Sequence, residues 1–200
     1  MKILLETPRL ILRQITQADS DRLLKLNSDP DVMRYISGGV VSTEEEITKK
    51  FLPDVLSYYQ EYEKLGFWAV IEKSSQEFIG WVILRPESRF RLAQLLDVVD
   101  PNALELGYRL QKSSWGQGYA TEVSQALLDF VGSTGNYDKV IAWAIAENKA
   151  SLRVMEKLGL KLEQQYIPGA ADFLPNVELL ASPVIQFILG RNLLKYSKKI

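Results

Sequence analysis

Residues 115–120 are the segment whose residue types point most directly to a ligand. They read WGQGYA and place two glycines between an apolar run at 104–110 and an amphipathic segment at 118–131. Glycine allows a sharp turn and a close approach of the backbone to a ligand, and the first N–H groups of a helix have no partner within the helix. Because the helix dipole favours negative charge there, the segment is a candidate phosphate-binding turn. An ordinary tight turn between a strand and a helix is the alternative interpretation.

The spacing of these glycines does not match two common nucleotide motifs. It is not the G-x-G-x-x-G pattern of dinucleotide-binding domains, and no Gly-Lys-Ser/Thr follows as in a P-loop. A small α/β domain that binds another nucleotide through this turn would also lack the acidic partner for the ribose. That class therefore ranks last among our hypotheses.

Histidine and cysteine are both absent from the chain. Their absence excludes Ser-His-Asp and Cys-His nucleophilic catalysis and disulfide bonds, and it removes the usual ligands of a structural zinc site. We therefore expect no metal centre. Acid–base chemistry falls to Asp, Glu, Lys, Tyr, Ser or water.

Length and composition predict one globular domain spanning residues 1–200, with 46% hydrophobic and 24% charged residues. The net charge of −1 gives no indication of nucleic acid or of an anionic membrane as a partner. No apolar run reaches the ~18 residues of a membrane span, and the opening MKILLE is too short and too soon charged for a signal peptide. We expect a cytoplasmic location.

The hydrophobic pattern predicts a mixed α/β fold. The order strand–helix–strand–helix over 104–158 predicts two adjacent parallel strands, and the remaining strands are expected to be antiparallel. Residues 86–102 read as an irregular connection. Strands are expected at 9–13, 67–71, 78–84, 104–110, 140–146, 162–167 and 184–189, and helices after 16, at 43–62, 118–131 and 149–158.

Two capping boxes mark the starts of the N-terminal helices. Thr16 with Asp19 and Thr43 with Glu46 have the Ser/Thr-x-x-acid spacing that begins a helix. Pro53 lies inside the second helix, so we expect a kink or two shorter helices there.

Several segments, in this order along nearly the whole chain, resemble the GNAT superfamily of acetyltransferases. The most similar branch includes the ribosomal-protein alanine N-acetyltransferases and the spermidine acetyltransferases. The resemblance implies one domain whose mostly antiparallel sheet is splayed at two parallel strands, with helices on both faces, and it implies acetyl-CoA as cosubstrate. The segments that carry it are 7–13, 29–33, 66–71, 78–81, 105–122 and 147–159.

The resemblance also implies where acetyl-CoA binds. The family's turn reads Gln/Arg-x-x-Gly-x-Gly/Ala; Gly118 and Ala120 match it, whereas Trp115 stands at the first position, which removes a polar contact but no backbone N–H donor. The pantetheine arm would lie along the strand that ends at Arg109 and Leu110. The implied cofactor-binding residues are Arg109, Leu110, Trp115, Gly116, Gln117, Gly118, Tyr119, Ala120, Thr121, Asn148 and Met155.

Acetyl transfer to an amine needs a neutral amine, a donor for the developing oxyanion and stabilisation of the departing thiolate. An alkyl ammonium has a pKa of ~10.4 and an α-amine one of ~7.7–8, so a base matters more for a polyamine than for an N-terminus. Glu105 is the first candidate base, because it alternates with Leu104 and Leu106 on the strand expected to line the cofactor. The alternative is a solvated or salt-bridged strand residue, with Arg109 on the same face as the partner.

The proton donor for the thiolate is less defined. Ser151 is either a first-turn helix residue or a polar group near the thioester sulfur, and Asn148 is either a helix N-cap or a contact to the cofactor or a water. Met155 stands where the family often has a thiolate-protonating Tyr. Ser151, a Tyr from elsewhere such as Tyr108, or solvent would take that role, unless no specific acid is needed.

The leading hypothesis is an N-acetyltransferase that acts by direct attack in a ternary complex. Its acceptor is a primary amine: a protein N-terminal amine first, then a small amine or polyamine. A catalytically silent domain that binds or senses CoA is the alternative, because of Met155. The acceptor side is expected at 29–39, 51–62, 86–102 and 168–183, where the last two segments could instead form a homodimer contact.

Overall fold

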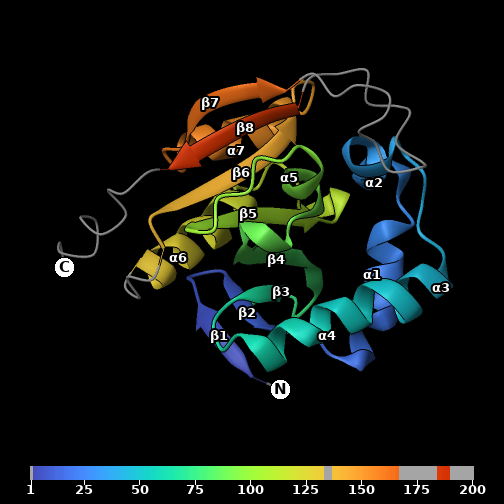
Figure 1. The fold of residues 1–200 in the computed structure, drawn as a ribbon. Helices are drawn as coiled ribbons and strands as arrows, with labels where there is room; N and C mark the ends of the chain where they lie inside the picture. Colours follow the sequence, from blue (N-terminus) through green and yellow to red (C-terminus); the bar gives the residue numbers. More distant parts are fainter. Residues whose placement is uncertain (1, 133–136, 167–183, 190–200) are drawn as a thin grey trace. The chain divides into compact units, whose positions relative to one another are not determined.

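The computed structural model describes residues 2–132, 137–166 and 184–189. Figure 1 shows the helices and strands of the described residues, coloured along the sequence. The chain forms two compact units, the first from Met1–Ile83 and Tyr108–Val123, the second from Leu84–Gly107 and Ser124–Ile200. None of the helices in the described ranges combines the length and apolar character needed to cross a membrane. The predicted strands at 162–167 and 184–189 are found as β7 (Lys161–Tyr166) and β8 (Val184–Leu189), whereas the segment 168–183 lies outside the described residues.

The sheet of the first unit begins with strands that are neighbours in sequence order. β1 (Ile3–Glu6), β2 (Leu10–Gln14), β3 (Gly66–Glu72) and β4 (Phe78–Pro86) lie side by side, and the first three are antiparallel. β1 was not predicted. The predicted hairpin between β3 and β4 is present, closed by a hydrogen bond from the Glu72 N–H to the Glu77 carbonyl at 2.9 Å.

Along the sequence, these helices of the first unit come between β2 and β3. They are the 3-10 turn η1 (Gln17–Asp19), α1 (Ser20–Asn27), α2 (Pro30–Ser37), α3 (Glu44–Glu46), the π-helical turn η2 (Ile47–Phe51) and α4 (Leu52–Glu61). Their apolar faces pack with the sheet into one core cluster that includes Leu23, Leu52 and Trp81. Burial of this surface is the main stabilising term of the unit.

Both predicted capping boxes are present at the helix starts. The predicted interruption of the second helix is also present, as the π turn that directly precedes α4, in which Pro53 occupies one of the first two positions. Proline has no N–H to donate to the preceding turn, so the hydrogen-bond ladder changes spacing there.

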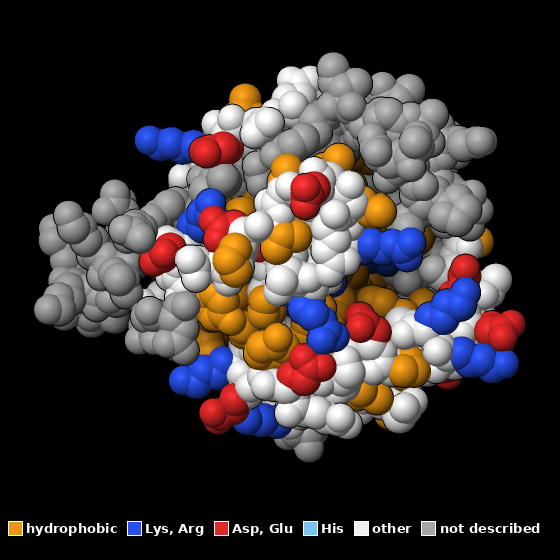
Figure 2. Space-filling view, in the orientation of Figure 1, with side chains coloured by type: hydrophobic (Ala, Val, Ile, Leu, Met, Phe, Trp, Pro, Cys, Tyr) orange, Lys and Arg blue, Asp and Glu red, His pale blue; other side chains and the backbone are white. Residues whose placement is uncertain are grey.

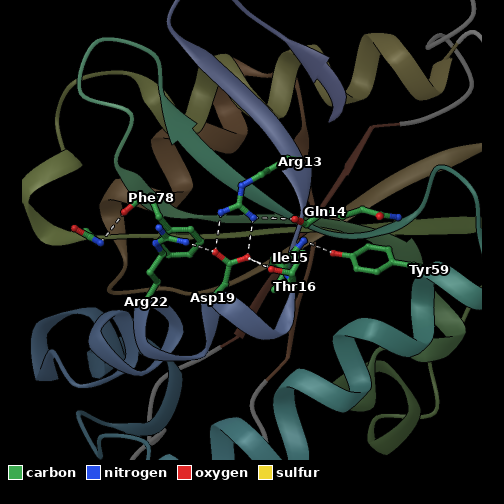
Figure 3. Close-up of polar contacts among 9 residues, drawn as sticks. Arg13, Gln14, Ile15, Thr16, Asp19, Arg22, Tyr59 and Phe78 are labelled. Atoms are coloured by element: carbon green, nitrogen blue, oxygen red, sulfur yellow. Dashed lines mark hydrogen bonds and ion pairs between the residues drawn. The ribbon is translucent and has the colours of Figure 1, made fainter. Parts of the chain in front are cut away.

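A buried ion-pair cluster holds β2 against η1 (Figure 3). The two terminal guanidinium nitrogens of Arg13, Nη1 and Nη2, donate to the fully buried carboxylate of Asp19 at 2.7 Å, and Arg22 donates to the same carboxylate at 2.8 Å. Burial by itself raises the pKa of Asp19, but these bonds and one from the Thr16 N–H outweigh it and lower the pKa to about 2. The carboxylate is therefore ionised, and it neutralises an arginine that is only 5% exposed.

The second unit contains the parallel pair that the sequence predicts. The first residues of β5 (Ala103–Leu110) pair with β6 (Lys139–Ile145) from Ala103↔Lys139 to Leu106↔Ala142, and both strands continue beyond the last pair. β6, β8 and β7 then follow in that order as antiparallel neighbours. The predicted mixed, mostly antiparallel α/β fold is confirmed.

Residues 86–102 are more regular than the sequence suggested. They contain the 3-10 turn η3 (Glu87–Arg89) and the helix α5 (Arg91–Leu95). The buried carboxylate of Glu87 accepts from the Asp100 N–H at 2.8 Å, and Asp100 forms an ion pair with Lys139 at 2.7 Å. These long-range contacts order the segment, and no local pattern reveals them.

The face of the molecule in Figure 2 carries charges of both signs. In the space-filling view, Lys and Arg side chains are interspersed with Asp and Glu side chains over the visible face (Figure 2). This face shows no single-sign field of the kind that attracts nucleic acid.

Candidate functional site

The turn between β5 and the next helix has the backbone conformation that its glycines allow. After β5 come the 3-10 turn η4 (Lys112–Ser114), then Gly116 with φ +75° and Gly118 with φ +82°, and then α6 (Tyr119–Gly132). Both φ values lie in the left-handed region, which costs other L-residues ~1–2 kcal/mol. The sharp strand-to-helix turn that the sequence predicts is therefore present.

The space beside Gly116 is open. A Cβ atom built on Gly116 would have no atom within 4 Å, and one on Gly118 would lie 3.5 Å from the Arg9 side chain. The Glu122 N–H donates to the Gly118 carbonyl at 3.0 Å, and the N–H groups before it belong to the helix start, which lacks intrahelical acceptors. Open space beside unsatisfied N–H donors fits a phosphate group.

A clamp of polar side chains, formed by Thr7, Arg9 and Glu122, fixes the start of α6. The Glu122 carboxylate accepts from the Thr7 hydroxyl at 2.6 Å, from the Arg9 N–H at 3.1 Å and from Arg9 Nε at 2.7 Å. Arg9 also donates to the Gln117 carbonyl at 3.0 Å, and its guanidinium lies 4.5 Å from the Tyr119 ring centroid. The clamp thus ties the turn to the β1–β2 corner.

Three side chains of the turn are directed toward the protein itself. Trp115 is 47% exposed and donates from Nε1 to the Leu110 carbonyl at 2.9 Å. Gln117 donates to the Ser113 carbonyl at 2.9 Å, and the Tyr119 hydroxyl donates to Glu72. If Trp115, Gln117 and Tyr119 contact a cofactor, as the resemblance implies, their backbone N–H groups would be the donors, because their side-chain donors already have partners within the protein. Ala120 and Thr121 complete the first turn of α6.

Arg109 and Leu110 are the last two residues of β5, and their side chains have different surroundings. Leu110 is buried, whereas the Arg109 guanidinium donates from Nη1 to Asn27 Oδ1 at 2.6 Å and stacks on Trp81 at 5.0 Å. Burial lowers the pKa of Arg109 to about 10. The side chain is thus directed at α1 and β4.

Glu105 is paired, and with a residue that the sequence did not suggest. Its Oε2 accepts from Arg85 Nε at 2.7 Å, and the Arg85 guanidinium stacks on Phe90 at 5.0 Å. The expected pairing with Arg109 was wrong. Burial raises the pKa of Glu105, and the charge and hydrogen bond of Arg85 oppose that increase. The salt-bridged alternative is therefore present, and a base at this position would work with one oxygen held by a guanidinium.

The residues predicted at the start of α7 (Lys149–Lys157) form a helix cap. Asn148 Oδ1 accepts from the Ser151 N–H at 3.1 Å, so the N-cap interpretation of Asn148 is confirmed. Met155 is only 2% exposed and packs in the interior of the second unit. This burial places its thioether in a packing role. Gly159 follows the helix with φ +79°, the left-handed conformation that is common at a C′ position.

Sequence reasoning missed four residues that shape this region: Asn27, Arg85, Arg9 and Glu122. Arg9 and Glu122 lie 113 positions apart, so no local spacing connects them. Their residue types gave no signal, because isolated charged residues on strands and helices are mostly solvated. Among the described residues, no group of three or more Asp and Glu side chains is placed to hold a metal ion.

Comparison with known proteins gives one consistent result. Residues 9–161 match the family model described as an acetyltransferase (GNAT) domain. The uncharacterized N-acetyltransferase YoaA of Bacillus subtilis (strain 168) is 30% identical over 162 residues, which cover 80% of this chain and 84% of that protein.

Solved structures agree on the fold. RimL, a ribosomal L7/L12 alpha-N-protein acetyltransferase in complex with coenzyme A, has a TM-score of 0.73 and 18% identity, covering 96% of this chain and 99% of that chain. Spermidine N-acetyltransferase from Vibrio cholerae, in complex with CoA and spermine, has a TM-score of 0.70 and 15% identity, covering 94% of this chain and 99% of that chain. The resemblance inferred from the motifs is confirmed.

Proposed function

We propose that this chain, which belongs to the GNAT family of acetyltransferases, transfers the acetyl group of acetyl-CoA directly to a primary amine in a ternary complex. The predicted enzyme class, an N-acetyltransferase, follows from the family. The cosubstrate, the acceptor and the residue roles are the proposed part.

The observation that carries the proposal is the open turn at Gly116. Its left-handed glycines and the helix start at Tyr119 present N–H groups to empty space, and residues 116–121 would hold a pyrophosphate there. β5 continues beyond its last residue pair with β6, Leu106↔Ala142. This supports the proposal that the edge of β5 after Leu106 binds the amides of a pantetheine arm. Acetyl-CoA, when bound, supplies an activated thioester.

A protein N-terminal amine is the favoured acceptor. An α-amine has a pKa of ~7.7–8 and is substantially neutral near neutral pH, whereas an alkyl amine at ~10.4 needs a strong base. Arg85 holds one oxygen of Glu105 and opposes the increase in its pKa that burial causes, which favours the α-amine because that acceptor needs the weaker base. RimL is a ribosomal L7/L12 alpha-N-protein acetyltransferase, and this supports the same preference.

Within this proposal Glu105 accepts the amine proton, directly or through a water. Ser151 is the proposed proton source for the departing thiolate, because Met155 has no proton to donate. Its N–H is already used by the Asn148 cap, so the hydroxyl is the group that would act.

A catalytically silent CoA-binding domain is the second candidate. The ion pair between Glu105 and Arg85 favours it, because a structural salt bridge needs no catalytic role. The two candidates differ in turnover and share cofactor binding.

Calorimetric titration with acetyl-CoA, CoA, ATP and NAD, followed by thiol-release assays over an amine panel, tests the proposal. We expect both CoA species to bind, no binding of ATP or NAD, and thiol release with at least one amine. Binding without release over the panel would favour the silent domain. Absence of binding by either CoA species would overturn both candidates.

A further inference from the structure

Arg109 differs from Arg13 and Arg85, two other arginines whose side chains are largely removed from solvent. Arg13 is neutralised by Asp19 and Arg85 by Glu105, each at 2.7 Å. Arg109 has no carboxylate partner among the described residues; its guanidinium donates to the amide oxygen of Asn27 and stacks on the Trp81 ring. A guanidinium removed from water without an anion is costly, so buried arginines are normally paired.

Two N–H donors in this cluster are left without an acceptor. Arg109 Nε and Trp81 Nε1 are both buried and have no hydrogen-bond partner within the described part of the chain. They belong to stacked side chains, since the guanidinium carbon lies 5.0 Å from the Trp81 ring centroid. Buried donors without acceptors are rare in folded proteins, and two side by side indicate an acceptor that the described residues do not supply.

Asn27 fixes the guanidinium in this position. It is buried, and its Nδ2 donates to Ser42 Oγ at 3.4 Å, which leaves Oδ1 directed at Arg109. The side chain is thus held at a defined place, on the strand that leads seven residues later into Gly116 and within the same unit.

We infer that Arg109 and Trp81 bind a carboxylate of the acceptor, so that the substrate is an amine that also carries an acidic group. The inference rests on the proposed acetyltransferase function and narrows its substrate class. A carboxylate offers the oxygens that two unpaired donors require, and it neutralises the guanidinium. A polyamine would instead place further positive charge beside an uncompensated cation.

Matched amines that differ only in the anionic group test the inference. The first pair is alanyl-alanine and its C-terminal amide, the second is 4-aminobutanoate and 4-aminobutanamide, and spermidine completes the panel. Thiol release from acetyl-CoA gives kcat/KM for each. The variants are Arg109→Gln and Arg109→Lys, with Arg153→Gln as a control that removes the same charge from an exposed position on α7.

We expect at least one carboxylate to be preferred over its amide by about 10- to 100-fold, the range of a charge-assisted hydrogen bond. With acetyl-CoA saturating, Arg109→Gln should bring the ratio of kcat/KM for the acid to kcat/KM for its amide down to about 1, whatever the change in overall activity. Arg109→Lys should keep part of the preference for the acid, and Arg153→Gln should keep all of it. Equal use of acid and amide by the wild type, a preference for spermidine, or a preference that survives Arg109→Gln would overturn the inference.

The Arg109 Nε–H signal gives a second readout that needs no turnover. In nitrogen-15 NMR the signal is assigned by its loss in Arg109→Lys, and it should shift on titration with either carboxylate at saturating acetyl-CoA but not with the amides. An unchanged signal would overturn the inference even if none of these amines is acetylated. Failure of acetyl-CoA to bind would instead overturn the proposed function, so the two failures are distinguishable.

Discussion

Replacing Gly116 with alanine should separate cofactor binding from folding. No atom lies within 4 Å of the added Cβ, so the substitution causes no steric clash in the free protein. The φ of +75° remains, at a strain of ~1–2 kcal/mol, which the lower entropy of the unfolded chain offsets by ~0.4–1 kcal/mol. We expect the free energy of unfolding to fall by about 1 kcal/mol.

The same methyl group should weaken acetyl-CoA binding much more. It fills the space in which we place the pyrophosphate, and loss of one charge-assisted hydrogen bond costs ~1.5–3 kcal/mol, about 10- to 100-fold in affinity. Calorimetry measures the affinity and urea denaturation the stability. Gly159→Ala is the matched control, because its φ of +79° is equally left-handed but Gly159 lies outside the turn. Acetyl-CoA affinity equal to that of the wild type in Gly116→Ala would refute the placement of the phosphate.

Three further substitutions test other parts of the account. Asp19→Asn leaves the buried Arg13 without an anion and should lower the free energy of unfolding by ~3 kcal/mol in urea titrations; a loss below ~1 kcal/mol would contradict this. Because the folded pKa of Asp19 is about 2, below the ~3.9 of an unfolded chain, its stabilising contribution is present above pH ~4 and disappears as the pH falls toward 2, and the variant should lack this acid-dependent loss. Glu105→Gln should lower kcat by about 10²- to 10⁴-fold with acetyl-CoA affinity retained, and unchanged kcat would remove Glu105 from the base role. Glu122→Gln should weaken the clamp with Arg9, lower the free energy of unfolding by ~1–2 kcal/mol and reduce acetyl-CoA affinity several-fold in calorimetry. A loss of stability with unchanged acetyl-CoA affinity would show that the clamp contributes to folding and not to cofactor binding.

Local patterns predicted most of the fold. Periodicity located the strands and helices, the Thr43–Glu46 spacing located a helix start, and the strand–helix alternation after residue 104 predicted the parallel pair. These features depend on neighbouring residues, so the sequence records them directly.

Long-range pairing could not be predicted in the same way. The partner of Glu105 is Arg85, 20 positions earlier, and the alternation of side chains on one strand suggested Arg109 instead. Cross-strand partners depend on register, which is set by the whole sheet. The Glu87 contact that orders residues 86–102 is also long-range, and for that reason α5 was missed.

The candidate site was predicted in part. The glycine turn and the Asn148 cap have the local geometry that their residues suggested. The unpaired donors of Arg109 and Trp81 were not foreseeable, because an arginine and a tryptophan on strands read as ordinary surface and core residues until burial and missing partners are known. Absence of a partner is a property of the folded chain.

Mass spectrometry of an amine panel incubated with the protein and acetyl-CoA tests the central claim most directly. We expect an acetylated amine that accumulates with the wild type and is strongly reduced with Gly116→Ala. Absence of any acetylated amine at protein concentrations where acetyl-CoA is bound would contradict the claim that this chain is an active amine acetyltransferase.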